Sequence, residues 1–137
     1  MTSLPPITVS SLDLARLEAM LESPAHRGLP AAEALADELG RATVLPPARM
    51  PPDVVTMNST VDCVDEASGE THALTLVYPR EADAATGRVS VLAPVGSALL
   101  GLSVGQSIDW PGPGGRPLRL RVTGIRYQPE AAGDLDR

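Results

Sequence analysis

One stretch decides the fold: Val89-Ser90-Val91-Leu92-Ala93-Pro94-Val95-Gly96-Ser97-Ala98-Leu99-Leu100-Gly101-Leu102, which continues as Ser103-Val104-Gly105-Gln106. Its first residues alternate at a period of two, which predicts a strand over 89–93 that Pro94 ends, because proline has no backbone N–H for a sheet. Proline is tolerated in the first turn of a helix, and Gly101 suits the left-handed position that often follows a helix. The stretch therefore predicts a strand, one or two turns of apolar helix, a turn and a second strand.

Two amphipathic helices are predicted well before this stretch. The first should begin at Leu12 and end near Ser23, with Asp13 in the first turn, where the helix dipole favours a carboxylate. The second is expected over 31–42, with apolar residues at helical spacing on one face. The connector between them, residues 24–30, is rich in proline and glycine, so the two helices should pack as a short antiparallel helical hairpin, or coiled coil.

Strands are predicted in the second half of the chain, on both sides of the central stretch. Alternating apolar and polar residues indicate strands at 60–64, 72–78, 107–110 and 118–123. A dense cluster of proline and glycine at 111–115 predicts a turn between the last two strands. Gly124 breaks the alternation of the last strand, so a β-bulge there would return Ile125 and Tyr127 to the core face.

The sequence divides into three parts. Residues 1–45 are expected to form the N-terminal helical hairpin, residues 46–52 a proline-rich linker and residues 53–137 a sheet domain. The boundary lies at the linker because prolines at this density force extended backbone and forbid both helix and central strand. A helical hairpin followed by an antiparallel sheet with one short helix makes the expected fold class α+β.

Composition excludes several classes of function. The chain has 137 residues and no phenylalanine, and its only aromatic residues are Trp110, Tyr78 and Tyr127, which argues against an aromatic-lined pocket and against base stacking. A net charge of −6 repels a phosphate backbone, so no direct sequence-specific binding to nucleic acid is expected. One cysteine, no signal peptide and no long apolar run predict a cytoplasmic protein without disulfides or membrane spans.

The sequence contains no reactive constellation typical of an enzyme. It has no P-loop, Rossmann glycine fingerprint, zinc-ligand spacing or nucleophile elbow. Cys63 has valines nearby and no basic neighbour, so it is predicted to be a buried core side chain rather than an activated thiolate. His26 and His72 lie in different segments of the chain. We therefore expect no catalytic residue, no metal site and no cofactor.

Arginines recur at the outward positions of the last predicted strand. Arg116, Arg119, Arg121 and Arg126 could form a basic stripe on one face of the sheet, which would suit an acidic partner surface. The simpler interpretation is the ordinary outward charge of an antiparallel sheet. The first alternative makes Arg116, Arg119 and Arg121 candidate partner-binding residues.

Several segments resemble known bacterial proteins. The central stretch, from Ser90-Val91-Leu92-Ala93-Pro94 to Ala98-Leu99-Leu100-Gly101, is similar to the C-terminal domain of the Gre transcript-cleavage factors, as is the later Pro113-Gly114-Gly115 turn. Three other segments closely resemble the Rnk family, regulators of nucleoside diphosphate kinase related to the Gre factors: Pro52-Asp53-Val54-Val55-Thr56-Met57-Asn58-Ser59, Thr75-Leu76-Val77-Tyr78-Pro79 and Tyr127-Gln128-Pro129-Glu130-Ala131-Ala132-Gly133-Asp134. The resemblance covers nearly the whole chain.

The resemblance implies an FKBP-like sheet domain and a non-enzymatic transcription regulator that binds RNA polymerase. In the manner of Gre factors, the sheet domain would dock near the secondary channel and the hairpin would point into it. The tip residues His26, Arg27 and Gly28 are then candidate partner-binding residues. Gre factors carry acidic residues on a longer coiled coil, where they help to hold a catalytic magnesium ion. Residues 24–30 contain no carboxylate, so no stimulation of transcript cleavage is expected.

The resemblance also implies a link to nucleoside diphosphate kinase. The family name points to regulation of this kinase, and for a polymerase-binding protein we expect regulation of kinase levels that is indirect, through transcription. The alternative is direct regulation of kinase activity by protein contact.

Overall fold

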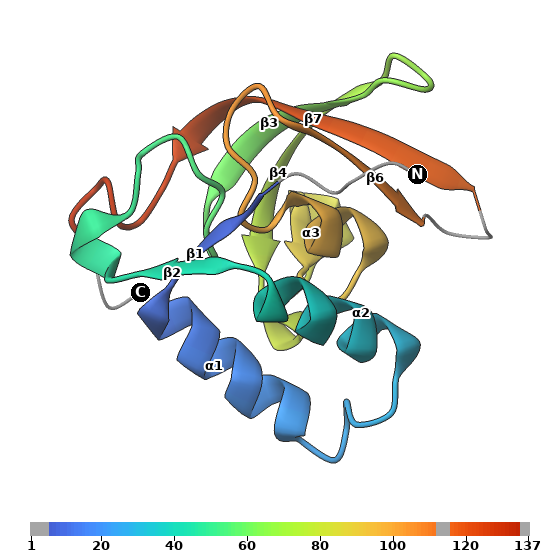
Figure 1. The fold of residues 1–137 in the computed structure, drawn as a ribbon. Helices are drawn as coiled ribbons and strands as arrows, with labels where there is room; N and C mark the ends of the chain where they lie inside the picture. The colour runs from blue at the N-terminus through green and yellow to red at the C-terminus, as the bar shows by residue number, and fades with distance from the viewer. Residues whose placement is uncertain (1–5, 112–115, 135–137) are drawn as a thin grey trace.

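The computed structural model describes residues 6–111 and 116–134, so most of the turn predicted at 111–115 lies outside the described residues. Helices, strands and 3-10 turns (η) follow one another in this order: β1 (Thr8–Ser10), α1 (Ser11–Glu22), α2 (Pro30–Gly40), β2 (Thr43–Leu45), η1 (Pro47–Arg49), β3 (Thr60–Asp65), β4 (Thr71–Val77), η2 (Pro79–Glu81), η3 (Ala84–Thr86), β5 (Arg88–Ser90), α3 (Pro94–Leu99), β6 (Ser107–Pro111) and β7 (Pro117–Tyr127). Figure 1 shows the main sheet at the top of the molecule, with α3, α2 and α1 following below it.

The two N-terminal helices form where the sequence predicts them. α1 is capped by Ser10, whose hydroxyl accepts a hydrogen bond from the Asp13 N–H at 3.0 Å. The connector reverses the chain, so α1 and α2 run in roughly opposite directions (Figure 1). α2 ends at Gly40, earlier than predicted, because the chain continues into β2, which pairs in parallel with β1. Within the described ranges no helix is long and apolar enough to cross a membrane.

The main sheet is mixed rather than antiparallel, which corrects the prediction. Its strand order is β5-β4-β3-β7-β6. The pairs β3–β4, β3–β7 and β6–β7 are antiparallel, whereas β4 and β5 are parallel. The physical reason lies in residues 78–87, which form a crossover with the two turns η2 and η3 instead of a tight hairpin turn. A crossover returns the chain in its original direction and so produces a parallel pair.

The stretch that decides the fold forms one edge of this sheet and the helix beside it. β5 stops at Ser90, earlier than the predicted strand, and α3 begins at Pro94 as predicted. The Ser97 hydroxyl donates a hydrogen bond to the Val91 carbonyl at 2.6 Å, which holds the helix against the preceding turn. Gly96 makes this close packing possible, because an added Cβ there would lie 2.1 Å from the Ser90 carbonyl oxygen.

Gly101, just after α3, forms backbone hydrogen bonds that link this helix to the N-terminal strand β1. Its φ of +81° is the left-handed conformation that the sequence predicts after this helix. Its carbonyl accepts the Thr8 N–H at 3.1 Å, and its N–H donates to the Val55 carbonyl at 2.9 Å. An added Cβ would lie 2.7 Å from the Ile7 Cβ. The glycine therefore allows three segments distant in sequence to meet.

The predicted bulge in the last strand is present. Cys63 of β3 pairs with Val122, but the preceding residue Asp62 pairs with Gly124, so one residue of β7 is left over. A second shift of register lies between Thr60 and Val61 of β3. The bulge brings Ile125 against the hydrophobic core, as the sequence predicts. Tyr127 is half-buried outside this cluster, and its hydroxyl donates a hydrogen bond to the Asp134 carboxylate.

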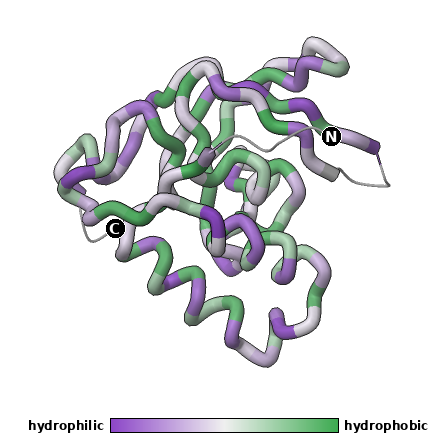
Figure 2. Tube along the Cα trace, viewed as in Figure 1, coloured by the Kyte–Doolittle hydropathy of each residue, from purple (hydrophilic) through white to green (hydrophobic). Residues whose placement is uncertain are grey.

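The hydrophobic core is continuous between the helices and the sheet. Ile7, Leu17 and Leu35 from the N-terminal part belong to the same buried cluster as Leu76 of β4 and Leu99 of α3. Figure 2 shows that hydrophobic residues recur along the helices and along the strands of the sheet. Burial of such side chains stabilises a fold by about 1.5–3 kcal/mol each. The helical hairpin is thus packed on the sheet in this structure.

Candidate partner interface

The connector between α1 and α2 carries the residues that the sequence predicts at the hairpin tip. Its backbone is ordered by hydrogen bonds from the N–H groups of His26 and Arg27 to the Ser23 carbonyl, at 2.9 and 3.1 Å. His26 is half-buried, and its Nδ1 lies 3.2 Å from the Met20 carbonyl. A carbonyl only accepts hydrogen bonds, so Nδ1 carries the proton. Arg27 and Gly28 are exposed, which leaves them available to a partner.

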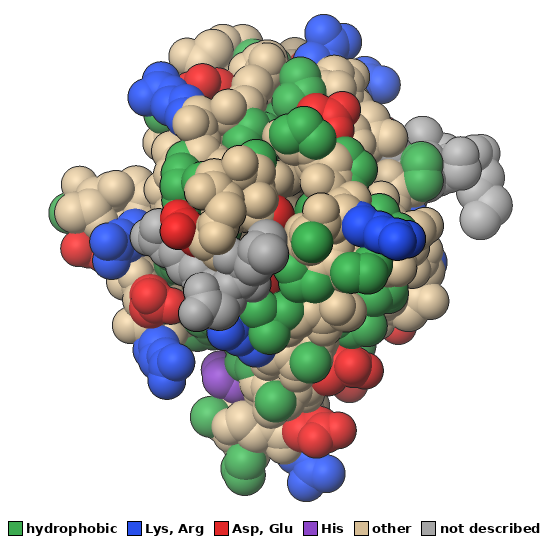
Figure 3. Space-filling view, turned by 90° about the vertical axis from the view of Figure 1, so that its left-hand side faces the viewer, with side chains coloured by type: hydrophobic (Ala, Val, Ile, Leu, Met, Phe, Trp, Pro, Cys, Tyr) green, Lys and Arg blue, Asp and Glu red, His purple; other side chains and the backbone are tan. Residues whose placement is uncertain are grey.

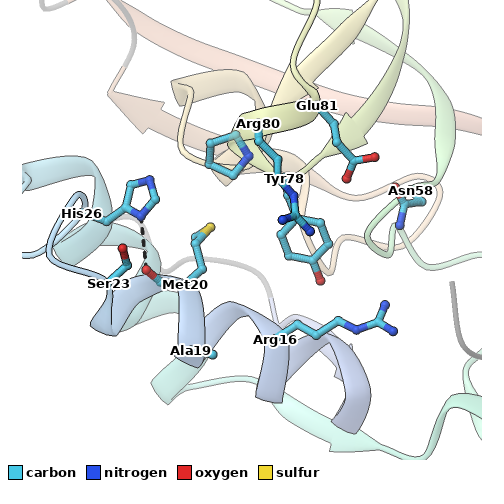
Figure 4. A pocket seen from close by; sticks show the side chains of 10 residues that line it. Arg16, Ala19, Met20, Ser23, His26, Asn58, Tyr78, Arg80 and Glu81 are labelled. Atoms are coloured by element: carbon cyan, nitrogen blue, oxygen red, sulfur yellow. Dashed lines mark hydrogen bonds between the residues drawn. The ribbon is translucent and has the colours of Figure 1, made fainter.

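A groove of about 790 Å³ lies beside this tip, between α1, the connector and η2. Its lining contains Arg16, Ala19, Met20, Ser23, His26, Asn58, Tyr78, Pro79, Arg80 and Glu81. In Figure 4, α1 and the connector form one wall, and the segment after β4 forms the other. The groove is therefore built from two parts of the chain that are far apart in the sequence.

Tyr78 reaches from the end of β4 toward α1. Burial raises the pKa of its hydroxyl well above the ordinary value; the nearby charge of Asp13 raises it further and the Arg16 guanidinium lowers it. Tyr78 therefore stays protonated at every physiological pH. Figure 4 shows its hydroxyl directed toward α1.

Asp13 links α1 to the sheet domain through a hydrogen bond. Its carboxylate accepts the Met57 N–H at 3.1 Å, and only 2% of the residue is exposed. Burial raises the pKa of Asp13 to about 7, the hydrogen bond from Met57 lowers it, Glu130 raises it and Arg16 lowers it. The sequence places Asp13 correctly in the first helical turn, but its burial is a property of the tertiary structure.

The arginines of the last strand lie on the surface beside carboxylates. Arg119 is 3.5 Å from Asp109 of β6, and Arg121 is 3.2 Å from Glu66. Arg116 is also exposed, next to the segment that is not described. Exposed pairs of this kind contribute about 0–1 kcal/mol to stability. Because Arg119 and Arg121 face carboxylates, the local field at these two positions is close to neutral.

A second groove lies beside the stretch that decides the fold. It has a volume of about 520 Å³ and is mostly apolar, and its lining includes Trp110 of β6, Leu92, Pro94 and residues of α2. Figure 3 shows a different face of the molecule, where acidic, basic and hydrophobic side chains are interspersed. Trp110 is half-buried, and tryptophan is a typical anchor of protein–protein interfaces.

The groups that could support catalysis or metal binding are dispersed. Cys63 is buried as predicted, and burial raises the pKa of its thiol to about 11. His72 lies at the start of β4, where its Nε2 is 3.8 Å from Glu70. Among residues 6–111 and 116–134, no three His, Cys, Asp or Glu side chains are grouped so that they could hold a metal ion.

Sequence reasoning identifies His26 but misses the groove that His26 lines. Arg16 lies in α1, whereas Tyr78 and Arg80 follow β4, so α2, β2, β3 and β4 separate the two walls of the groove in the sequence. The only local signal is Pro79 after the strand, which predicts the end of β4 but not what packs against it. The groove depends on how α1 folds back onto η2.

Two family models match the chain in sequence order. The first, described as "Rnk N-terminus", matches residues 5–45. The second, described as "Transcription elongation factor, GreA/GreB, C-term", matches residues 50–127. The two matches together cover both the helical hairpin and the sheet domain.

Individual relatives agree with these matches. The regulator of nucleoside diphosphate kinase from Escherichia coli K12 is 51% identical over 96% of this chain and 97% of its own length. The transcription elongation factor GreA from Rhodospirillum rubrum is 39% identical over a match that covers 68% of this chain and 59% of that protein. A solved structure titled prokaryotic transcription elongation factor GreA/GreB from Nitrosomonas europaea matches with a TM-score of 0.71 and 50% identity, over 90% of this chain and 99% of that one.

Proposed function

The chain belongs to the Rnk family, whose sheet domain is related to the C-terminal domain of GreA and GreB, and we propose that it is a non-enzymatic transcription regulator that binds RNA polymerase. The observation that carries this proposal is the succession of both family matches along one chain. A domain shared with transcription elongation factors supports polymerase as the partner.

The proposed binding mode follows that of Gre factors. The sheet domain docks near the secondary channel of the polymerase, and the hairpin tip points toward the channel. The candidate contacts are His26, Arg27 and Gly28 at the tip and, less centrally, Arg116, Arg119 and Arg121 on the sheet. The apolar groove at Trp110 offers a further contact surface. In this proposal residues 1–45 and 53–137 act as two units, joined by residues 46–52.

The hairpin should not stimulate transcript cleavage. A magnesium ion requires oxygen ligands, and residues 24–30 contain no carboxylate. α1 has 12 residues and is therefore about 18 Å long, which is a short reach. In a cleavage assay with stalled elongation complexes, the protein alone should leave the cleavage rate unchanged. In excess it should suppress the cleavage that an added Gre factor stimulates. Stimulation by this protein alone, or no effect on the Gre factor, would contradict the proposed mode.

A double variant tests the contribution of the hairpin tip. His26→Ala combined with Arg27→Ala should weaken competition with a Gre factor, because it removes the polar side chains that point from the connector. The free energy of unfolding should change by no more than about 1 kcal/mol, since Arg27 is exposed and His26 is only half-buried. Arg49→Ala, an exposed arginine of η1, is the matched control. If both variants compete equally well with the Gre factor, the hairpin tip is not part of the polymerase interface.

The name of the Escherichia coli relative supports a second candidate function, direct control of nucleoside diphosphate kinase. We propose instead that the link is indirect and runs through transcription of the kinase. Purified kinase should therefore have the same rate with and without an excess of this protein. A changed rate would favour direct regulation.

A further inference from the structure

A third groove, which we call the hairpin groove, lies between α1 and α2. It has a volume of about 330 Å³, and its lining belongs to these two helices alone: Leu14, Glu18, Leu21, Glu22, Ala36, Leu39 and Gly40. The connector residues that are proposed to contact the polymerase are not among them. The hairpin groove is therefore a separate surface of the helical hairpin.

Most of the lining of the hairpin groove is apolar. Leu14 and Leu21 are two helical turns apart on α1, so they lie on one face of that helix. Both are half-buried, because part of each side chain packs against the hydrophobic core and the rest stays accessible. α2 contributes Ala36 and Gly40, which are exposed and one turn apart. Small residues at a helix surface permit another helix to approach closely.

Two carboxylates line the same groove without a cation. Glu18 and Glu22 are exposed and one turn apart on α1. Within the described part of the chain neither of them forms an ion pair, whereas Glu38 of α2 is paired with Arg41. The residues described as lining the groove include no lysine, arginine or histidine. The hairpin groove is thus apolar and negatively charged.

The positions of these carboxylates are unfavourable for α1 itself. Like charges four residues apart on a helix repel each other. Glu22 is also the last residue of α1, where the helix dipole disfavours a negative charge, and the last turn of this helix contains no basic residue. A cation placed beside Glu18 and Glu22 would relieve both effects. The charge pattern therefore favours a cationic partner.

The same charges argue against a second copy of this chain as the partner. In a symmetric dimer the same surface of both chains meets itself. Glu18 and Glu22 of one chain would then lie near those of the other, and each chain has a net charge of −6. A symmetric contact through the hairpin groove would thus add repulsion instead of relieving it.

We propose that the hairpin groove binds an amphipathic helix of a partner protein, with apolar side chains against Leu14 and Leu21 and with lysine or arginine side chains beside Glu18 and Glu22. An amphipathic helix in a groove presents its apolar anchors at helical spacing, which matches the two leucines. Its cationic residues should also be one turn apart, like the two glutamates. The inference does not depend on RNA polymerase as a partner of this chain.

The test uses the purified full chain and a model peptide, without polymerase. The peptide has about 15 residues, the length at which an isolated helix becomes marginally stable, with leucines along one face and two lysines one turn apart beside them. A control peptide carries glutamates in place of the lysines. Fluorescence anisotropy of the labelled peptides at low salt should show saturable binding of the lysine peptide below millimolar concentration. The glutamate peptide should bind at least about tenfold more weakly.

A double variant tests the contribution of the two carboxylates. Glu18→Gln combined with Glu22→Gln should weaken binding of the lysine peptide about fivefold, as expected for the loss of two exposed ion pairs. Glu33→Gln combined with Asp37→Asn is the matched control, because it changes the net charge equally at exposed positions of α2 outside the hairpin groove. The control should bind the lysine peptide as the wild type does.

A second pair of variants tests whether the peptide occupies the groove. Ala36→Arg places a large cationic side chain in it and should weaken binding of the lysine peptide at least about tenfold. Ala67→Arg, at an exposed position in the turn after β3, adds the same charge elsewhere and should have little effect.

Several results would overturn the proposal. They are no binding of the lysine peptide below millimolar concentration, equal binding of the two peptides, or equal binding by either variant and its control. Sedimentation analysis of the chain alone tests the competing occupant. A concentration-dependent dimer that Ala36→Arg abolishes would also overturn the proposal and assign the hairpin groove to a second copy.

Discussion

Replacement of Gly96 by alanine is expected to lower the free energy of unfolding by more than about 4 kcal/mol, or to prevent folding. The added Cβ would lie 2.1 Å from the Ser90 carbonyl oxygen and 3.1 Å from the Val91 Cα. Both neighbours are backbone atoms, which cannot rotate away as a flexible side chain could. α3 would have to move off the end of β5, and the hydrogen bond from Ser97 to Val91 would be lost with it.

Gly40→Ala is the matched control for this prediction. Gly40 ends α2, and an added Cβ there has no neighbour within 4 Å. Its free energy of unfolding should change by less than about 1 kcal/mol, because alanine has the higher helix propensity. Urea denaturation followed by far-ultraviolet circular dichroism measures both variants. If Gly96→Ala is as stable as Gly40→Ala, the packing of α3 on the β5 turn described above is incorrect.

Asp13→Asn is expected to change how stability depends on pH. The pKa of Asp13 is raised from 3.8 to about 7 in the folded protein. The folded state therefore holds a proton that the unfolded state releases, and the wild-type chain loses stability as the pH rises through this interval. A single group of this kind contributes a slope of about 1.4 kcal/mol per pH unit between its two pKa values.

The variant should lack this slope because asparagine has no charge to desolvate. Its amide oxygen can still accept the Met57 N–H, which keeps the attachment of α1. The difference in stability between variant and wild type should thus increase from pH 4 to pH 7 in favour of the variant, and then level off. Asp37→Asn, on the exposed side of α2, should show no such trend. Denaturation curves at pH 5, 6, 7 and 8 measure the free energy of unfolding of each variant. Parallel pH profiles for wild type and Asp13→Asn would contradict the prediction.

Local patterns predicted most of the helices and strands. The alternation at 60–64, 72–78 and 107–110 corresponds to β3, β4 and β6, and the register break at Gly124 corresponds to a real bulge. Gly101 adopts the left-handed conformation expected after a short helix. These features depend on backbone chemistry and on side chains within a few residues, which the sequence displays directly.

Long-range pairing could not be predicted in the same way. The alternation of residues 89–93 indicates a strand but not its direction, and the parallel pairing of β5 depends on the crossover at 78–87. Asp13 is a polar residue that the pattern places at a helix start, whereas its burial depends on Met57. The groove depends on the meeting of α1 with η2. Each of these features is determined by the packing of distant segments.

Binding to core RNA polymerase is the most direct test of the proposed function. A fluorescently labelled full chain is titrated with core polymerase at moderate salt, and an unlabelled Gre factor is then added as a competitor. We predict saturable binding that the Gre factor reverses, as expected for two proteins with related docking domains. No binding, or binding that an excess of Gre factor leaves unchanged, would contradict the account.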